Sequence, residues 1–164
     1  GIFLYRRADD GSALIRWEIR SPGKRILTIR NDEALVYEPN INSARRYRLG
    51  KNRDKAEYLA LGIGQSPSDL RKTFHIAYRG GEKIRGNACS VLVLKPKDPK
   101  AAAMFASITV WIKDSTGVSA RMKLEEPSGD YFLVNFSNEQ LNRPIDESRF
   151  RQRLSSGVEM MEVF

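Results

Sequence analysis

The sequence predicts a mainly β protein with a few helical turns, an α+β fold class built around antiparallel strands. Three observations predict it: short segments that alternate apolar and charged residues, turns rich in Pro, Gly and Asn between them, and one change to helical composition near the middle of the chain. Because a large antiparallel sheet must curl or close to bury its apolar face, we expect a barrel or a strongly curved half-barrel covered by helices.

The first half of the chain alternates strands and turns. Residues 15–20 (IRWEIR) have the period of two that is typical of a half-buried strand. A turn follows at 21–24 (SPGK), because Pro presets φ and Gly tolerates positive φ. Further strands are predicted at 25–30, 34–37 and 43–49. Short links between consecutive strands favour an antiparallel meander.

The middle of the chain changes period. Residues 54–61 are rich in helix formers, and Gly62 is a plausible C-terminal stop. We expect residues 52–72 to be a helical, mobile insert and a candidate lid.

The second half returns to strands. They are predicted at 74–78, 89–94, 108–113, 120–126 and 131–137, with a short polar helix or turn at 145–150. A chain of 164 residues is long enough for one domain with a core, so residues 1–164 are interpreted as a single domain.

Composition and charge limit the classes of function. Hydrophobic residues make up 41% and charged residues 29%, as in ordinary globular proteins, and no apolar run is long enough to cross a bilayer. The formal net charge is +8, and all of the excess lies before residue 87, which would attract anionic partners. The chain begins without Met, and removal of an export signal is one explanation among several.

The sequence offers no active site. His75 is the only histidine and Cys89 the only cysteine, so a His-ligated metal cluster and an internal disulfide are both excluded. We therefore predict no catalytic residues, no metal and no cofactor. Arg and aromatic residues interleave at 45–48, as in nucleic-acid stacking platforms, but alternating strands produce this pattern by themselves, so no nucleic-acid partner is predicted.

Two blocks of short motifs carry a family resemblance. The first consists of 1–7 (GIFLYRR), 16–18 (RWE), 21–24 (SPGK) and 35–40 (LVYEPN), and the second of 92–97 (LVLKPK), 108–112 (ITVWI), Phe150 and 156–159 (SGVE). In this order and spacing they resemble the LolA-like outer-membrane lipoprotein-sorting family. The helix and the first strand that precede the Gly-led strand in that family are absent from this chain.

The resemblance implies a curved antiparallel half-barrel with a helical lid, enclosing an apolar cavity. It implies an exported, periplasmic, non-enzymatic carrier of lipoprotein acyl chains or lipids, with sorting partners at the inner and outer membranes and at most a peripheral contact with a membrane. The alternative is a regulatory or protein-interaction module on the same scaffold with a filled core.

The resemblance also implies site residues. Arg7, at the end of the Gly-led strand, matches an arginine that contacts the lid. The alternation of apolar and polar residues within the strands also groups apolar side chains that would form the core of any sheet protein. The resemblance assigns them to the cavity wall: Ile15, Trp17, Ile19, Leu27, Ile29, Ile108, Val110, Ile112, Met122, Leu124, Phe132, Val134 and Phe136.

Overall fold

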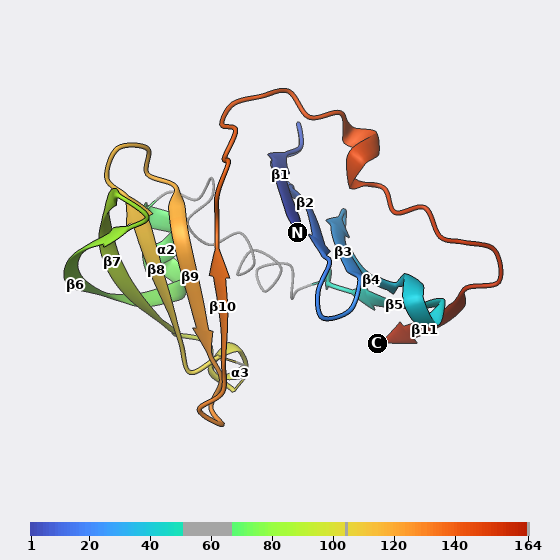
Figure 1. Ribbon diagram of the computed structural model, residues 1–164. Helices are drawn as coiled ribbons and strands as arrows, with labels where there is room; N and C mark the ends of the chain where they lie inside the picture. Colours follow the sequence, from blue (N-terminus) through green and yellow to red (C-terminus); the bar gives the residue numbers. More distant parts are fainter. Residues whose placement is uncertain (51–66, 104, 164) are drawn as a thin grey trace. The chain divides into compact units, whose positions relative to one another are not determined.

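The computed structural model describes residues 1–50, 67–103 and 105–163. These residues form two compact units, each built on one curved sheet (Figure 1). The described residues of unit 1 lie within Gly1–Ala60 and Asn142–Phe164, and those of unit 2 lie within Leu61–Leu141. The mainly β class is confirmed, and the single domain expected for residues 1–164 stays a prediction.

Unit 1 is a six-stranded sheet, which we call sheet 1. Its strands are β1 (Ile2–Arg7), β2 (Ala13–Ile19), β3 (Arg25–Arg30), β4 (Glu33–Glu38), β5 (Ser43–Arg48) and β11 (Glu159–Val163), in the spatial order β1-β2-β3-β4-β5-β11. Strands β1 to β5 form the expected antiparallel meander. Strand β11 corrects the fully antiparallel prediction, because it runs parallel to β5 at the end of a long crossover connection.

The sequence of the turn between β4 and β5 explains its conformation. It is a single 3-10 turn, η1 (Pro39–Ile41), which starts at Pro39, where the fixed φ of proline is tolerated. Asn42 ends it in the left-handed region at φ 50°, and its N–H donates to the Pro39 carbonyl at 3.2 Å.

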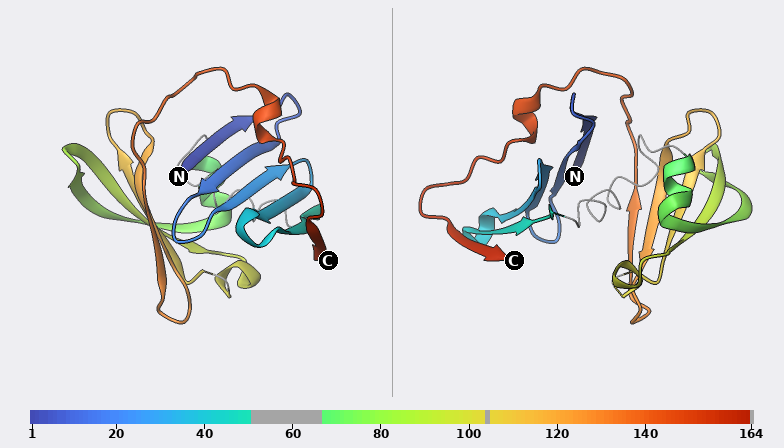
Figure 2. Two further views of the ribbon diagram at one scale, coloured as in Figure 1. Left: turned by 45° about the vertical axis from the view of Figure 1, so that its right-hand side comes forward. Right: turned by 180° about the vertical axis from the view of Figure 1, so that it is seen from behind.

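The C-terminal segment, residues 142–158, runs along one face of sheet 1 (orange to red in Figure 2). It contains one 3-10 turn, η4 (Glu147–Phe150), where a short helix or turn was predicted. The Asp146 carboxylate caps this turn by accepting from the Ser148 N–H at 2.8 Å. Phe150, at the end of the turn, is only 1% exposed. The segment is therefore held by a packed aromatic ring as well as by polar contacts.

Unit 2 is a five-stranded sheet, which we call sheet 2. Its elements are α2 (Pro67–Thr73), β6 (Phe74–Ile84), β7 (Asn87–Pro96), α3 (Pro99–Ala102), β8 (Ser107–Lys113), β9 (Ser119–Glu125) and β10 (Tyr131–Asn135), with the strands in the order β10-β9-β8-β7-β6. All pairs are antiparallel. A register shift between Tyr78 and Gly81 interrupts β6, where Gly80 adopts φ 97°.

Helical structure is sparse in the described parts of the chain. Helix α2 spans 7 residues and α3 spans 4. Most of the predicted 52–72 insert, residues 52–66, lies outside the described residues, and 67–72 belong to α2. The helical lid therefore stays a prediction.

Candidate functional site: the apolar sheet faces

Sheet 1 has two faces of different character. The strand registers place Trp17 opposite Phe3 and Leu27, and Ile15 opposite Tyr5 and Ile29. We call this side the Trp17 face. Its apolar members are Phe3, Tyr5, Ala13, Ile15, Trp17, Ile19, Leu27, Ile29, Ala34, Val36 and Tyr47.

The opposite side, the Leu14 face, is covered by the C-terminal segment. Leu154, Val158 and Met160 pack against a buried cluster on it that includes Leu35 and Tyr37. The Tyr37 hydroxyl lies 2.6 Å from the Ser155 hydroxyl oxygen. The Leu14 face is thus the packed interior of unit 1.

Most side chains of the Trp17 face are only half-buried. Ile15 and Ile29 are buried, whereas Phe3, Trp17 and Leu27 remain partly exposed. The rings of Phe3 and Trp17 meet edge to face, with centroids 6.0 Å apart and planes at 81°. Because the two rings are nearly perpendicular, the face is not flat at this point.

The structure brings together all five residues that were predicted for the cavity wall in the first half of the chain. Ile15, Trp17, Ile19, Leu27 and Ile29 lie on the Trp17 face, on neighbouring strands β2 and β3. Sequence reasoning missed Phe3, Tyr5, Val36 and Tyr47 on the same face, although the alternation within their own strands was the available signal.

Sheet 2 presents a comparable apolar side, which we call the Ile108 face. The registers place Ile108 opposite Leu94 and Leu124, and Val110 opposite Leu92 and Met122. Seven of the predicted wall residues lie on this face: Ile108, Val110, Ile112, Met122, Leu124, Phe132 and Val134. Phe136 follows the end of β10, where its N–H donates to the Ala120 carbonyl at 2.9 Å.

Exposure rises across the Ile108 face towards β10. Ile108 and Met122 are fully buried, and Val110 is 1% exposed. Phe132, on the outer strand β10, is 49% exposed, and Val134 is half-buried. The solvent-exposed part of this face therefore lies at β10.

The other side of sheet 2, the Trp111 face, mixes cations with aromatic rings. The Arg121 guanidinium lies 5.5 Å from the centroid of the Trp111 ring, and the Lys123 ammonium lies 4.8 Å from that of Tyr131. The Trp111 ring nitrogen donates to a Glu82 carboxylate oxygen at 2.8 Å. Trp111 also packs against a buried cluster of Ile84, Cys89 and Ala120, so this face combines charged, aromatic and apolar side chains.

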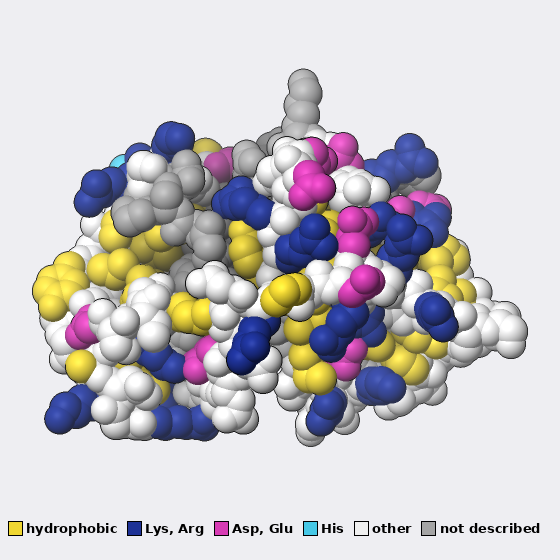
Figure 3. Space-filling view, turned by 90° about the horizontal axis from the view of Figure 1, so that it is seen from above, with side chains coloured by type: hydrophobic (Ala, Val, Ile, Leu, Met, Phe, Trp, Pro, Cys, Tyr) yellow, Lys and Arg dark blue, Asp and Glu magenta, His cyan; other side chains and the backbone are white. Residues whose placement is uncertain are grey.

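Many of the arginines that give the first half its positive charge lie in ion pairs. The Glu38 carboxylate forms ion pairs with the Nη2 atoms of Arg25 and Arg45, each at 2.7 Å. Hydrogen bonds from Arg45 and Arg25 hold the pKa of the Glu38 carboxyl below its usual value. Figure 3 shows Lys and Arg side chains interleaved with Asp and Glu over its right-hand part. Such pairing lowers the effective charge available to anionic partners.

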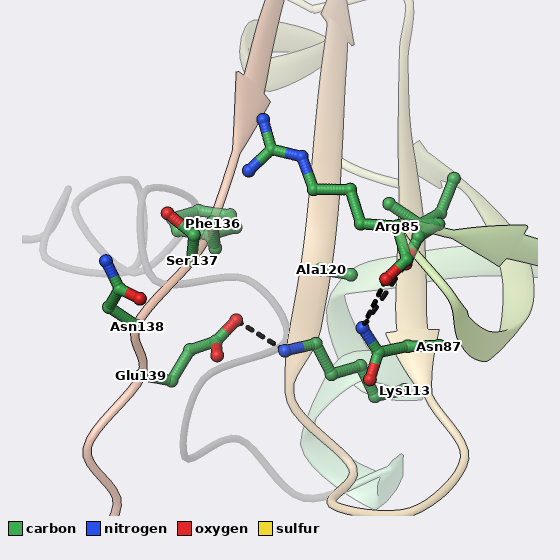
Figure 4. A pocket seen from close by; sticks show the side chains of 9 residues that line it. Arg85, Asn87, Lys113, Ala120, Phe136, Ser137, Asn138 and Glu139 are labelled. Atoms are coloured by element: carbon green, nitrogen blue, oxygen red, sulfur yellow. Dashed lines mark hydrogen bonds and ion pairs between the residues drawn. The ribbon is translucent and has the colours of Figure 1, made fainter.

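A small pocket lies at one end of sheet 2 (Figure 4). Its volume is about 220 Å³, and its lining residues are Ile84, Arg85, Asn87, Lys113, Ala120, Phe136, Ser137, Asn138 and Glu139. The Lys113 ammonium binds the Glu139 carboxylate at 2.6 Å, and this hydrogen bond lowers the pKa of Glu139. The pocket is smaller than the roughly 300 Å³ at which ordinary ligand sites begin, and ion-paired groups occupy its floor. The pocket is therefore a weaker candidate site than the apolar sheet faces.

Arg7 lies where the β1–β2 turn begins. Its Nη1 donates to the Gly11 carbonyl at 3.1 Å, within its own hairpin. Its neighbour Arg6 donates to the Ile145 carbonyl of the C-terminal segment at 3.2 Å. The lid contact predicted for Arg7 would involve residues outside the described ranges and stays a prediction.

The described residues contain no group of three or more His, Cys, Asp and Glu side chains that could hold a metal ion. His75 is exposed on β6, and Cys89 is buried on β7. Within residues 1–50, 67–103 and 105–163, no helix has the length and apolar character needed to span a membrane.

Each unit is therefore a curved β-sheet with one strongly apolar face, half-exposed in sheet 1 and mostly buried in sheet 2. The family model described as "Outer membrane lipoprotein carrier protein LolA" matches residues 12–153, and the chain belongs to this family. The resemblance seen in the sequence is thereby confirmed. The description of the family is that of a carrier protein. No curated protein matches the sequence.

Solved structures share the fold at low sequence identity. MucB is similar at 14% identity and a TM-score of 0.52, over 92% of this chain and 50% of that one. A conserved protein from Thermus thermophilus is similar at 15% identity and a TM-score of 0.54, over 92% and 75%. MucB in the MucA/MucB complex of Pseudomonas aeruginosa matches at 12% identity and a TM-score of 0.44, over 92% and 49%. The chain spans about half the length of the MucB chains that it matches.

Proposed function

We propose that this chain is a periplasmic carrier that binds the acyl chains of lipoproteins or lipids and takes part in outer-membrane lipoprotein sorting. The observation that carries the proposal is the asymmetry of sheet 1. Its Leu14 face is packed by the C-terminal segment, whereas most apolar side chains of its Trp17 face, Trp17 and Leu27 among them, remain half-exposed. The Ile108 face, with Phe132 exposed at β10, supplies a second hydrocarbon-binding surface in unit 2.

The free energy favours such a role. Each methylene removed from water contributes about 0.8 kcal/mol, so an acyl chain with about 15 methylenes gains roughly 12 kcal/mol. Association costs about 4–15 kcal/mol in lost freedom of motion, so the gain is of the same size as the cost. Only the surplus of the gain over the cost appears as affinity, and a modest surplus permits both capture and release. A carrier must hand its cargo on, and it works with sorting partners at the two membranes in this proposal.

The two tryptophans allow a direct test. Trp17 lies on the Trp17 face and Trp111 on the charged face of sheet 2. In the variant Trp111→Phe, only Trp17 fluoresces, and in Trp17→Phe only Trp111 does. Each variant is titrated with a brominated fatty acid, whose bromines quench tryptophan on contact, and with the same fatty acid without bromine as the control.

We expect strong, saturable quenching of Trp17 and little quenching of Trp111, because Trp17 lies among half-exposed apolar side chains whereas Trp111 contacts Arg121 and Glu82. Unlabelled lipid should reverse the quenching. Carriage of acyl chains is refuted if neither tryptophan is quenched and native mass spectrometry retains no lipid. Quenching of Trp111 alone would refute the assignment of the face.

The alternative function is a non-transporting module that binds a protein. The Trp111 face favours it, because Arg121 and Lys123 stack on aromatic rings there and Tyr131 is 63% exposed. This function predicts a stable protein partner and no fatty-acid quenching, so the same titration separates the two functions.

A further inference from the structure

Strand β10 is an outer strand of sheet 2 with unusual side chains for that position. Its sequence, Tyr131 to Asn135 (YFLVN), contains no charge and no proline. Tyr131, Phe132 and Leu133 are 63%, 49% and 43% exposed, which places three consecutive residues among the exposed large hydrophobics. Outer strands are normally protected from pairing by charged residues, prolines or bulges. Strand β10 carries none of these.

The backbone of β10 shows which groups point outward. The Glu126 N–H donates to the Asp130 carbonyl, and the Phe136 N–H donates to the Ala120 carbonyl, both at 2.9 Å. In an antiparallel pair, every second residue forms these bonds with the neighbouring strand. Residues 130, 132, 134 and 136 therefore bond to β9. The N–H and C=O groups of Tyr131, Leu133 and Asn135 point away from it.

We propose that β10 pairs in antiparallel fashion with β10 of a second copy of this chain, with Leu133 opposite Leu133. In this register each outward-pointing residue exchanges both backbone hydrogen bonds with a residue of the second copy. Tyr131 lies opposite Asn135, and Phe132 lies opposite Val134. The latter pairs an aromatic with a β-branched side chain, which stabilises neighbouring strands.

The charges around β10 are compatible with a second copy. The nearest cation on the Trp111 face, Lys123, is neutralised by Glu125 at 2.8 Å. Arg121 donates through Nε to the Asn135 side-chain oxygen at 2.8 Å, so it stays with its own strand. Since β10 itself has no charge, no like charges meet at the two-fold axis. An uncharged strand with three exposed hydrophobic residues can therefore meet a second copy of itself without electrostatic repulsion, and we take that copy as its partner.

Disulfide trapping tests the register. The native Cys89, which is buried, is first replaced by Ala so that only an introduced thiol reacts. In this background, Leu133→Cys places two thiols opposite each other, with Cα atoms about 5.5 Å apart, within the range that a disulfide spans. Tyr131→Cys is the matched control, because its two copies are offset by about 13 Å along the strands.

Mild oxidation followed by non-reducing electrophoresis should give a cross-linked dimer for Leu133→Cys and a monomer for Tyr131→Cys. Equal cross-linking of both variants would overturn the register, and cross-linking of neither would overturn the pairing.

Sedimentation gives a second, non-covalent measurement. The wild-type chain should show a concentration-dependent dimer. Leu133→Pro should be monomeric with an unchanged circular dichroism spectrum, because the N–H that it removes points away from β9. Tyr78→Lys removes an exposed hydrophobic side chain (64%, against 43% for Leu133) from the other outer strand, β6, and should leave the dimer intact. A monomeric wild type at all concentrations, or a dimer that survives Leu133→Pro, would overturn the proposal.

Discussion

Replacing Phe150 with alanine removes the side chain that holds the C-terminal segment on sheet 1. Phe150 is 1% exposed and ends the turn η4, which contacts β2 and β3. Burying a phenylalanine side chain contributes about 1.5–3 kcal/mol, and the cavity left by truncation raises the total cost to about 3–5 kcal/mol. Domains of this size are stable by about 5–15 kcal/mol, so the loss is a large fraction of the free energy of unfolding.

Urea unfolding measures this loss in unit 1 when Trp111 is replaced by Phe, because the remaining fluorophore, Trp17, lies on β2. We expect Phe150→Ala to lower the free energy of unfolding by about 3–5 kcal/mol. Phe132→Ala is the matched control, since Phe132 is 49% exposed and belongs to sheet 2. A change below about 1 kcal/mol for Phe150→Ala would show that the segment is not packed as described.

Two further predictions concern charged residues. The pKa of Glu38 is lowered in the folded protein by Arg45 and Arg25, so its contribution to stability is present above the ordinary carboxyl pKa of 4.5 and is lost as the pH falls below it. Glu38→Gln should therefore flatten the acid limb of a plot of thermal midpoint against pH, and an unchanged acid limb would contradict the role of this ion pair. Arg7→Leu should alter the rate at which a bound fluorescent fatty acid is released, since Arg7 is predicted to contact the lid. The thermal midpoint of this variant should hardly change, because Arg7 is exposed. Unaltered release kinetics would show that Arg7 does not hold a lid.

The strands were largely predictable because each carries its own signal. Residues 15–20, 25–30 and 108–113 alternate or cluster apolar side chains between turn residues, and each overlaps most of an observed strand. Alternation also sets which side chains share a face. Trp17 and Ile29 were therefore grouped correctly before any strand pairing was known.

The long-range arrangement could not be predicted in the same way. Strand β11 reads as Glu-Met-Met-Glu-Val, which has no clear period, and its partner β5 lies far away in the sequence. The C-terminal segment has no regular pattern either, yet Phe150 and Leu154 cover the Leu14 face. Its fixed position depends on tertiary contacts such as Arg30 with Glu147 at 2.7 Å, and no local sequence signal encodes them.

The parallel pairing of β11 with β5 has a consequence for how the protein is made. Met160 pairs with Ala44, so sheet 1 receives strand β11 only after more than a hundred further residues have been made. The strands of unit 2 lie close together in sequence and can assemble without waiting for either terminus. During biosynthesis β5 must remain without its outer neighbour throughout that interval. A chain truncated before β11 would leave the edge of β5 unpaired, where it is prone to aggregation and accessible to chaperones and proteases.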